Sequence, residues 1–80
     1  MTNAYMETFS QRLRQLREQS GKSAGTLSEL CGLPRNAISR YERMKCNPSV
    51  NALMRIADYF DVSVDYLVRI DVGKSENSIE

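Results

Sequence analysis

The apolar residues near the start of the chain recur at the spacing of a helix. Phe9, Leu13 and Leu16 repeat at i, i+4 and i+7, and polar and charged side chains fill the positions between them. The dipeptide Ser20-Gly21 follows, and such a pair is a typical stop signal for a helix. The pattern therefore predicts an amphipathic helix over about residues 7–19.

Two short helices with a very short connection are predicted next. Ser23 is the expected N-cap of the second helix, and Gly32 is expected to end it in a left-handed conformation. The third helix is predicted to begin at Leu33-Pro34, because proline is tolerated in the first turn of a helix. Apolar side chains at helical spacing support both helices: Ala24, Leu27, Leu30 and Cys31 in the second, and Ala37, Ile38 and Tyr41 in the third.

Two further helices complete the predicted domain. Ser49 is the expected cap of the fourth, Asp61-Val62-Ser63 ends it, and Ser63 caps the fifth, in which Val62 can pack against Leu67. The apolar side of the fourth helix consists of Val50, Leu53, Met54, Ala57 and Phe60. Five short helices with short connections predict a compact all-α bundle. The brief link between the second and third helices is the signature of a helix-turn-helix.

The two ends of the chain are less regular than its middle. Residues 1–8 are predicted to form an N-terminal arm or an extension of the first helix, residues 9–68 the domain, and residues 69–80 a tail that frays towards its end. Residues 68–72 alternate apolar and polar side chains, which is typical of a strand. This run is either the ragged end of the fifth helix or an extended segment that pairs with a second copy of the chain. The second interpretation assigns dimer contacts to Tyr66, Val68, Ile70 and Val72.

Length and composition exclude several classes of protein. Eighty residues, 41% of them hydrophobic and 26% charged, are typical of one small globular domain. The chain has no histidine, and Cys31 and Cys46 do not form a CxxC pair, so we expect no metal site, no cofactor and no enzymatic activity. No apolar run is long enough to span a bilayer, and the N-terminus lacks the pattern of a secretory signal. These features predict a cytoplasmic protein without a membrane partner.

Charge is distributed unevenly along the chain. Residues 1–46 hold eight basic and four acidic side chains, whereas residues 47–80 hold three basic and six acidic ones. The densest basic stretch is residues 35–45, in which four basic side chains accompany the single acidic Glu42. This stretch includes the third predicted helix, the second helix of the helix-turn-helix. The coincidence predicts that this helix faces a polyanion.

Three segments of the sequence are similar to the Xre/Cro/repressor family of helix-turn-helix DNA-binding proteins. They are RLRQLR at residues 12–17, ISRYER at residues 38–43 with Asn47-Pro48-Ser49 after it, and IADYFDVSVDYL at residues 56–67. The resemblance covers about residues 9–67 and implies a compact five-helix, repressor-like DNA-binding domain. It also implies that the third helix enters the major groove of DNA.

The resemblance assigns roles to individual residues of this chain. The implied base-contacting residues are Arg35, Asn36, Ser39 and Arg40. The implied phosphate-contacting residues are Ser23, Arg43 and Lys45. Arg17 and Glu42 match an ion pair that joins the first and third helices in the family. Removal of one partner of such a pair would leave the other charge unpaired.

The sequence departs from the family pattern at four positions. Ala24 replaces a common glutamine, which removes one polar contact to the DNA backbone, and Lys22 replaces an apolar residue. Pro34 stands where a serine or threonine cap is usual for the third helix. Met44 occupies a position that is usually glycine, where a positive φ would be strained for methionine.

These observations predict a transcriptional regulator that binds double-stranded DNA in a sequence-specific manner. The resemblance implies a repressor that binds a partly palindromic operator as a homodimer, with its two recognition helices about 34 Å apart. The alternative is a protein-interaction module, such as the antitoxin of a toxin–antitoxin pair, in which the acidic half from residue 47 onward holds the toxin.

Overall fold

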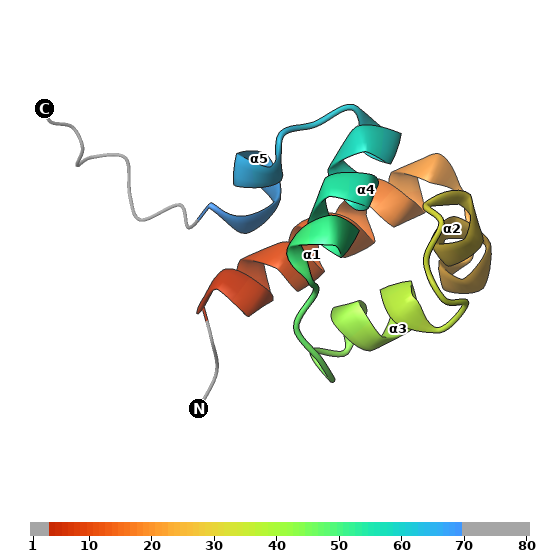
Figure 1. Cartoon of the computed structure of the whole chain (residues 1–80), viewed down its shortest axis with the longest axis horizontal. Helices are drawn as coiled ribbons and strands as arrows, with labels where there is room; N and C mark the ends of the chain where they lie inside the picture. The colour runs from red at the N-terminus through yellow and green to blue at the C-terminus, as the bar shows by residue number, and fades with distance from the viewer. Residues whose placement is uncertain (1–3, 70–80) are drawn as a thin grey trace, which may run out of the picture.

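The computed structural model describes residues 4–69, which form five α-helices and no strand. The helices are α1 (Ala4–Ser20), α2 (Ala24–Leu30), α3 (Ala37–Glu42), α4 (Val50–Phe60) and α5 (Val64–Val68). In Figure 1, α1 runs through the molecule, with α5 beside its N-terminal half and α2 near its C-terminal end. The predicted all-α bundle of five helices is confirmed.

The first helix is longer than its apolar pattern predicts. It begins at Ala4 rather than near residue 7 and ends at Ser20. Met6 is buried one turn before Phe9, so the apolar stripe of α1 extends further towards the N-terminus than the spacing of Phe9, Leu13 and Leu16 indicates. Residues 4–8 are therefore helical, and residues 1–3 lie outside the described part of the chain.

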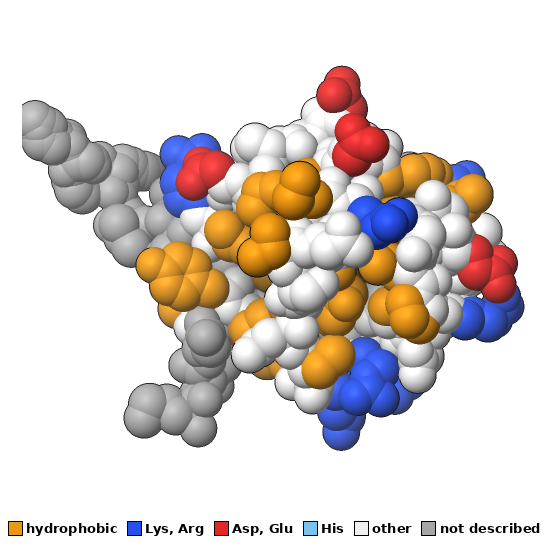
Figure 2. Space-filling model, viewed as in Figure 1, with side chains coloured by type: hydrophobic (Ala, Val, Ile, Leu, Met, Phe, Trp, Pro, Cys, Tyr) orange, Lys and Arg blue, Asp and Glu red, His pale blue; other side chains and the backbone are white. Residues whose placement is uncertain are grey.

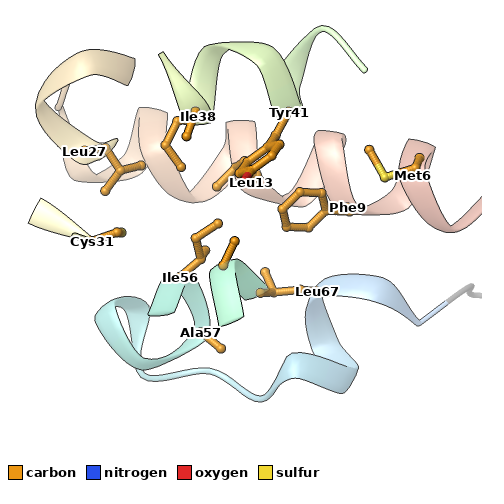
Figure 3. Close-up of a cluster of buried hydrophobic side chains, with 12 residues drawn as sticks. Met6, Phe9, Leu13, Leu27, Cys31, Ile38, Tyr41, Ile56, Ala57 and Leu67 are labelled. Atoms are coloured by element: carbon orange, nitrogen blue, oxygen red, sulfur yellow. The ribbon is translucent and has the colours of Figure 1, made fainter. Parts of the chain in front are cut away.

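The core receives side chains from all five helices. The largest fully buried apolar side chains are Phe9, Leu13, Leu27, Ile38, Ile56 and Leu67. Figure 3 shows the side chains of α1, α2 and α3 facing those of α4 and α5 across this core. The rings of Phe9 and Tyr41 lie 5.8 Å apart in a tilted arrangement that favours aromatic contact. Cys31 is also buried, and its burial raises the pKa of its thiol.

Three serines cap helices as the sequence predicts. The hydroxyl oxygens of Ser23, Ser49 and Ser63 accept hydrogen bonds from backbone N–H groups three residues further along, at 3.2, 3.0 and 2.9 Å. All three serines have the extended backbone that is typical of an N-cap. Each cap stabilises its helix by about 1 kcal/mol.

Four helices are followed by a residue with a left-handed backbone. These residues are Gly21 (φ 73°), Gly32 (φ 74°), Met44 (φ 59°) and Asp61 (φ 57°). Glycine adopts this conformation without a steric penalty, and aspartate is enriched there among the other residues. The positive φ predicted for Met44 is therefore present, and it is strained because methionine carries a β-carbon and no short polar group.

Neither a membrane-spanning helix nor a group of metal-binding side chains is present among residues 4–69. Between residues 4 and 69, no helix is both long enough and apolar enough to cross a membrane. In the same range, no three histidine, cysteine, aspartate or glutamate side chains gather in a way that could hold a metal ion.

Candidate nucleic-acid interface

Two backbone hydrogen bonds close the turn between α2 and α3. The N–H of Gly32 donates to the carbonyl of Glu29 at 3.0 Å, and the N–H of Leu33 donates to the carbonyl of Ser28 at 2.9 Å. This pattern, with its left-handed Gly32, is a Schellman motif. It reverses the chain sharply, so that α2 and α3 pack against each other.

The third helix begins later than the sequence predicts. The predicted start at Leu33-Pro34 is wrong, because Pro34, Arg35 and Asn36 lie in a tight turn before α3. In this turn the carbonyl of Pro34 accepts a hydrogen bond from the N–H of Ala37 at 2.9 Å, three residues away rather than four. Arg35 and Asn36 are consequently exposed just ahead of the first helical residue of α3.

A buried serine of α2 supplies the cap that α3 lacks in its own sequence. Asn36 precedes α3 but makes no side-chain cap. Instead, the hydroxyl of Ser28 accepts a hydrogen bond from the N–H of Ile38 at 3.0 Å and donates one to the carbonyl of Ala24 at 2.8 Å. Ser28 is fully buried, so these two bonds fix the start of α3 against α2.

The predicted pair of Arg17 and Glu42 holds the other end of α3. Arg17 Nε and Nη2 donate to the two carboxylate oxygens of Glu42 at 2.6 and 3.0 Å, which is a bidentate pair. The pKa of Arg17 is raised, mainly by this hydrogen bonding to Glu42. Arg17 Nη1 also donates to the carbonyl of Lys22 at 3.2 Å. One arginine of α1 therefore fixes both the C-terminal end of α3 and the residue before the Ser23 cap.

With both ends fixed, α3 presents one face to the core and one to solvent. Ala37, Ile38 and Tyr41 are buried, whereas Ser39 is half-buried and Arg40 is exposed. The exposed Arg43 and Lys45 follow in the loop after the helix. In Figure 2, a group of Lys and Arg side chains lies at the lower edge, where this loop lies in Figure 1, whereas basic and acidic side chains lie side by side at the left and right edges.

The basic groups of this face differ in whether they are already paired. Among residues 4–69, Arg40, Arg43 and Lys45 form no ion pair. Arg35 Nη1, in contrast, lies 2.5 Å from Glu29 Oε2, and both of these side chains are exposed. A β-carbon on Gly25 would lie 3.3 Å from the Arg35 guanidinium, so the missing side chain lets Arg35 rest across α2. Arg35 is therefore held beside α2 in the absence of DNA.

The predicted phosphate contacts lie at two places on the surface. Ser23 is exposed at the start of α2, where its hydroxyl also donates to Thr26 Oγ1 at 3.0 Å. Arg43 and Lys45 are exposed after α3, on either side of Met44. The structure thus brings the predicted base contacts together around the start and outer face of α3, with the predicted phosphate contacts at its margins.

The part of the chain that contains α2, the turn and α3 matches a known protein family. The helix-turn-helix family profile matches residues 13–67, which is more than half of the chain and includes all of α2, the turn and α3. The chain belongs to the Xre/Cro/repressor-type helix-turn-helix family. The family resemblance noted in the sequence is confirmed, with the match over residues 13–67.

Individual relatives agree with this assignment. A Methanocaldococcus jannaschii protein named as an HTH-type transcriptional regulatory protein is 36% identical over 72 residues, covering 85% of this chain and 23% of that protein. The restriction-modification controller protein C.AhdI from Aeromonas hydrophila is 35% identical with a TM-score of 0.72, covering 81% of this chain and 98% of that chain. The P22 c2 repressor, solved with a synthetic operator, is 26% identical with a TM-score of 0.71, covering 76% and 92%. The chain spans about a quarter of the archaeal relative it matches.

The predicted dimer contacts of this helix-turn-helix protein are only partly described. Tyr66 is partly exposed, and Val68 is half-buried against the core. Ile70 and Val72 lie outside the described residues. The helical part of α5 ends at Val68, and Arg69 has an extended backbone with φ −68° and ψ 128°.

Arg12 of α1, to which the sequence assigns no individual role, fixes the C-terminal end of α5. The Arg12 guanidinium lies 4.9 Å from the centroid of the Tyr66 ring. Its Nη1 donates to the carbonyl of Tyr66 and, at 3.1 Å, to that of Arg69. A cation next to the C-terminal carbonyls of a helix also stabilises the helix dipole. The only available sequence signal was an arginine beside Leu13 in the first helix, which reads as an ordinary solvent-facing charge.

Proposed function

We propose that this chain is a transcriptional repressor that recognises double-stranded DNA by inserting α3 into the major groove. The observation that carries the proposal is that α3 is held at both ends and exposed on one side. A hydrogen bond to Ser28 fixes its start, and the ion pair of Glu42 fixes its end. Its outer face carries exposed basic side chains. Such a helix is held rigidly with respect to the rest of the domain, which base readout requires. The names of its relatives as transcriptional regulators and controllers support the same function.

Base readout is assigned to the residues at the start and outer face of α3. Arg35 and Asn36 stand ahead of the helix, and the N-terminal residues of a recognition helix are those that reach base edges. Arginine pairs in a bidentate manner with guanine and asparagine with adenine, each worth about 1–3 kcal/mol of discrimination. Ser39 and Arg40, one turn further along α3, read the neighbouring bases.

Phosphate contacts are assigned to Ser23, Arg43 and Lys45. Ser23 lies at the exposed start of α2, where backbone N–H groups and the helix dipole favour an anion. Arg43 and Lys45 carry charges that are not paired with any described residue. Contacts of this kind contribute affinity and salt dependence rather than sequence preference.

We further propose that the chain acts in the cytoplasm as a homodimer on a partly palindromic operator, and that the bound dimer represses by blocking access of polymerase. One recognition helix reads only a few base pairs, and a two-fold dimer places a second one about 34 Å away. The partly exposed Tyr66 and the neighbouring Val68 are the described residues assigned to the dimer contact. A single monomeric species in sedimentation experiments, both free and bound to DNA, would contradict the dimer but not the DNA-binding surface.

The DNA-binding surface is tested by a salt titration of two matched variants. Lys45→Ala and Arg55→Ala each remove one exposed positive charge, from the loop after α3 and from α4 respectively. We expect Lys45→Ala to weaken binding to every duplex and to reduce the salt slope by about one, because one phosphate contact is lost. Arg55→Ala should change neither quantity. Equal effects of the two substitutions would contradict the assigned surface, since they would reflect net charge alone.

A further inference from the structure

The end of α3 repeats a hydrogen-bond pattern that two other helices share. The N–H of Met44 donates to the carbonyl of Tyr41 at 3.0 Å, and that of Lys45 donates to the carbonyl of Arg40 at 2.9 Å. The same two bonds end α2 around Gly32 and α4 around Asp61. The left-handed residue is thus glycine after α2, aspartate after α4 and methionine after α3. Of the three, methionine is the least suited to the conformation.

The strained methionine also stands in an unusual setting. Its side chain is 43% exposed, although it is apolar, and its immediate neighbours are the unpaired Arg43 and Lys45. Tyr5, Leu30, Val50 and Met54 are more exposed, but all four lie in regular helices and need no strained backbone. The strained backbone thus keeps an apolar side chain partly exposed between two charged ones. Strain of this kind persists at sites where the side chain has a function.

We propose that Met44 contacts DNA directly, with its side chain packed on a deoxyribose of the backbone between the phosphates that Arg43 and Lys45 bind. This inference rests on the proposed function and adds a residue to it. Deoxyribose carbons are the apolar part of the DNA backbone, and methionine is flexible and polarisable enough to fit such an irregular surface. The contact removes apolar surface from water without releasing a counterion. Its contribution is therefore independent of base sequence and of salt.

The test compares thermal stability with DNA affinity in four variants, using a mixed-sequence duplex over a range of salt concentrations. We expect Met44→Gly to raise the Tm by about 4 °C, because glycine relieves the strain. The same variant should lower DNA affinity by about five- to tenfold, since the buried apolar area is lost, with an unchanged salt slope. Met44→Ala keeps the β-carbon, so it should lower affinity to a similar degree without raising the Tm. Met44→Leu should bind as the wild type does.

Asp61→Gly is the matched control, because it changes the other non-glycine residue of positive φ among residues 4–69, which follows α4 rather than α3. It should not alter DNA affinity. The inference is overturned if Met44→Gly binds as tightly as the wild type. It is also overturned if Met44→Ala retains wild-type affinity, because the loss in Met44→Gly would then reflect a more flexible loop. If the wild type binds no duplex at low salt, the proposed function itself fails, which is a distinct result.

Discussion

Two of the three arginine–glutamate pairs among residues 4–69 have the same chemistry and different surroundings. The third is a longer contact of 3.6 Å between Arg14 Nε and Glu42 Oε1. Arg17 and Glu42 are 22% and 6% exposed, and they form a bidentate pair between α1 and α3. Arg35 and Glu29 are 69% and 58% exposed and meet through a single contact of 2.5 Å beside α2. A carboxylate that is removed from water depends on its partner, whereas an exposed one exchanges its partner for water at little cost.

Because of this difference in burial, the Arg17–Glu42 pair contributes to folding, whereas the Arg35–Glu29 pair affects DNA binding. The Arg17–Glu42 pair fixes α3 on the core and has no freedom to serve another ligand. Arg35 is assigned to base readout, but in the free domain it is paired with Glu29. This ion pair must break when Arg35 turns towards the groove. A weak, exposed pair allows this opening, because a surface pair contributes only about 0–1 kcal/mol.

The largest effect should follow from breaking the buried pair. Glu42→Ala leaves the Arg17 guanidinium without its carboxylate, and we expect a loss of about 3 kcal/mol in the free energy of unfolding. Chemical denaturation followed by circular dichroism measures this loss. Glu29→Ala is the control on the exposed pair and should change stability by less than about 0.5 kcal/mol. Similar losses in the two variants would show that burial does not distinguish the pairs.

An intermediate effect, on DNA binding alone, should follow from removing the exposed arginine. Arg35→Ala should leave the free energy of unfolding within about 0.5 kcal/mol of the wild type. It should reduce binding to the preferred sequence by about 1–3 kcal/mol while hardly changing binding to other duplexes. Arg17→Ala is the contrasting variant, because it frees the end of α3 and should therefore lower the free energy of unfolding and weaken binding to all duplexes. Competition titrations with specific and unrelated duplexes separate the two cases.

The smallest effect should follow from neutralising the exposed carboxylate. Glu29→Gln removes the competitor of DNA for Arg35 and one negative charge near the duplex. We expect affinity to rise, by at most about fivefold, with the largest gain at low salt. The Tm should not change. A fall in affinity would mean that Glu29 orients Arg35 for readout instead of competing for it.

Local signals in the sequence were sufficient to predict most of the fold. The five helices follow from apolar spacing, and the caps at Ser23, Ser49 and Ser63 follow from residue type and position. The left-handed Gly32 was predicted for the same reason. Each of these features depends on residues that are neighbours in the chain, so no tertiary information was needed.

Features that depend on contacts between helices were harder to predict. The start of α3 was misplaced because the cap that defines it comes from Ser28 in another helix, and a buried serine resembles any other small residue in a helical pattern. The partner of Arg35 was not foreseen, since it depends on how closely Gly25 lets the guanidinium approach α2. The pair of Arg17 and Glu42 was identified only through the family resemblance, because 25 positions separate the two residues.

The central claim is that α3, held in place by Ser28 and by the Arg17–Glu42 pair, reads a DNA sequence. Selection of bound fragments from a randomised duplex library, at about 0.15 M salt with competitor DNA, tests it most directly. We predict enrichment of an inverted repeat whose half-sites lie about one helical turn apart. A single half-site would retain the readout and remove the stable dimer. Retention of DNA without any enriched sequence would contradict the claim, because α3 would then bind only the phosphate backbone.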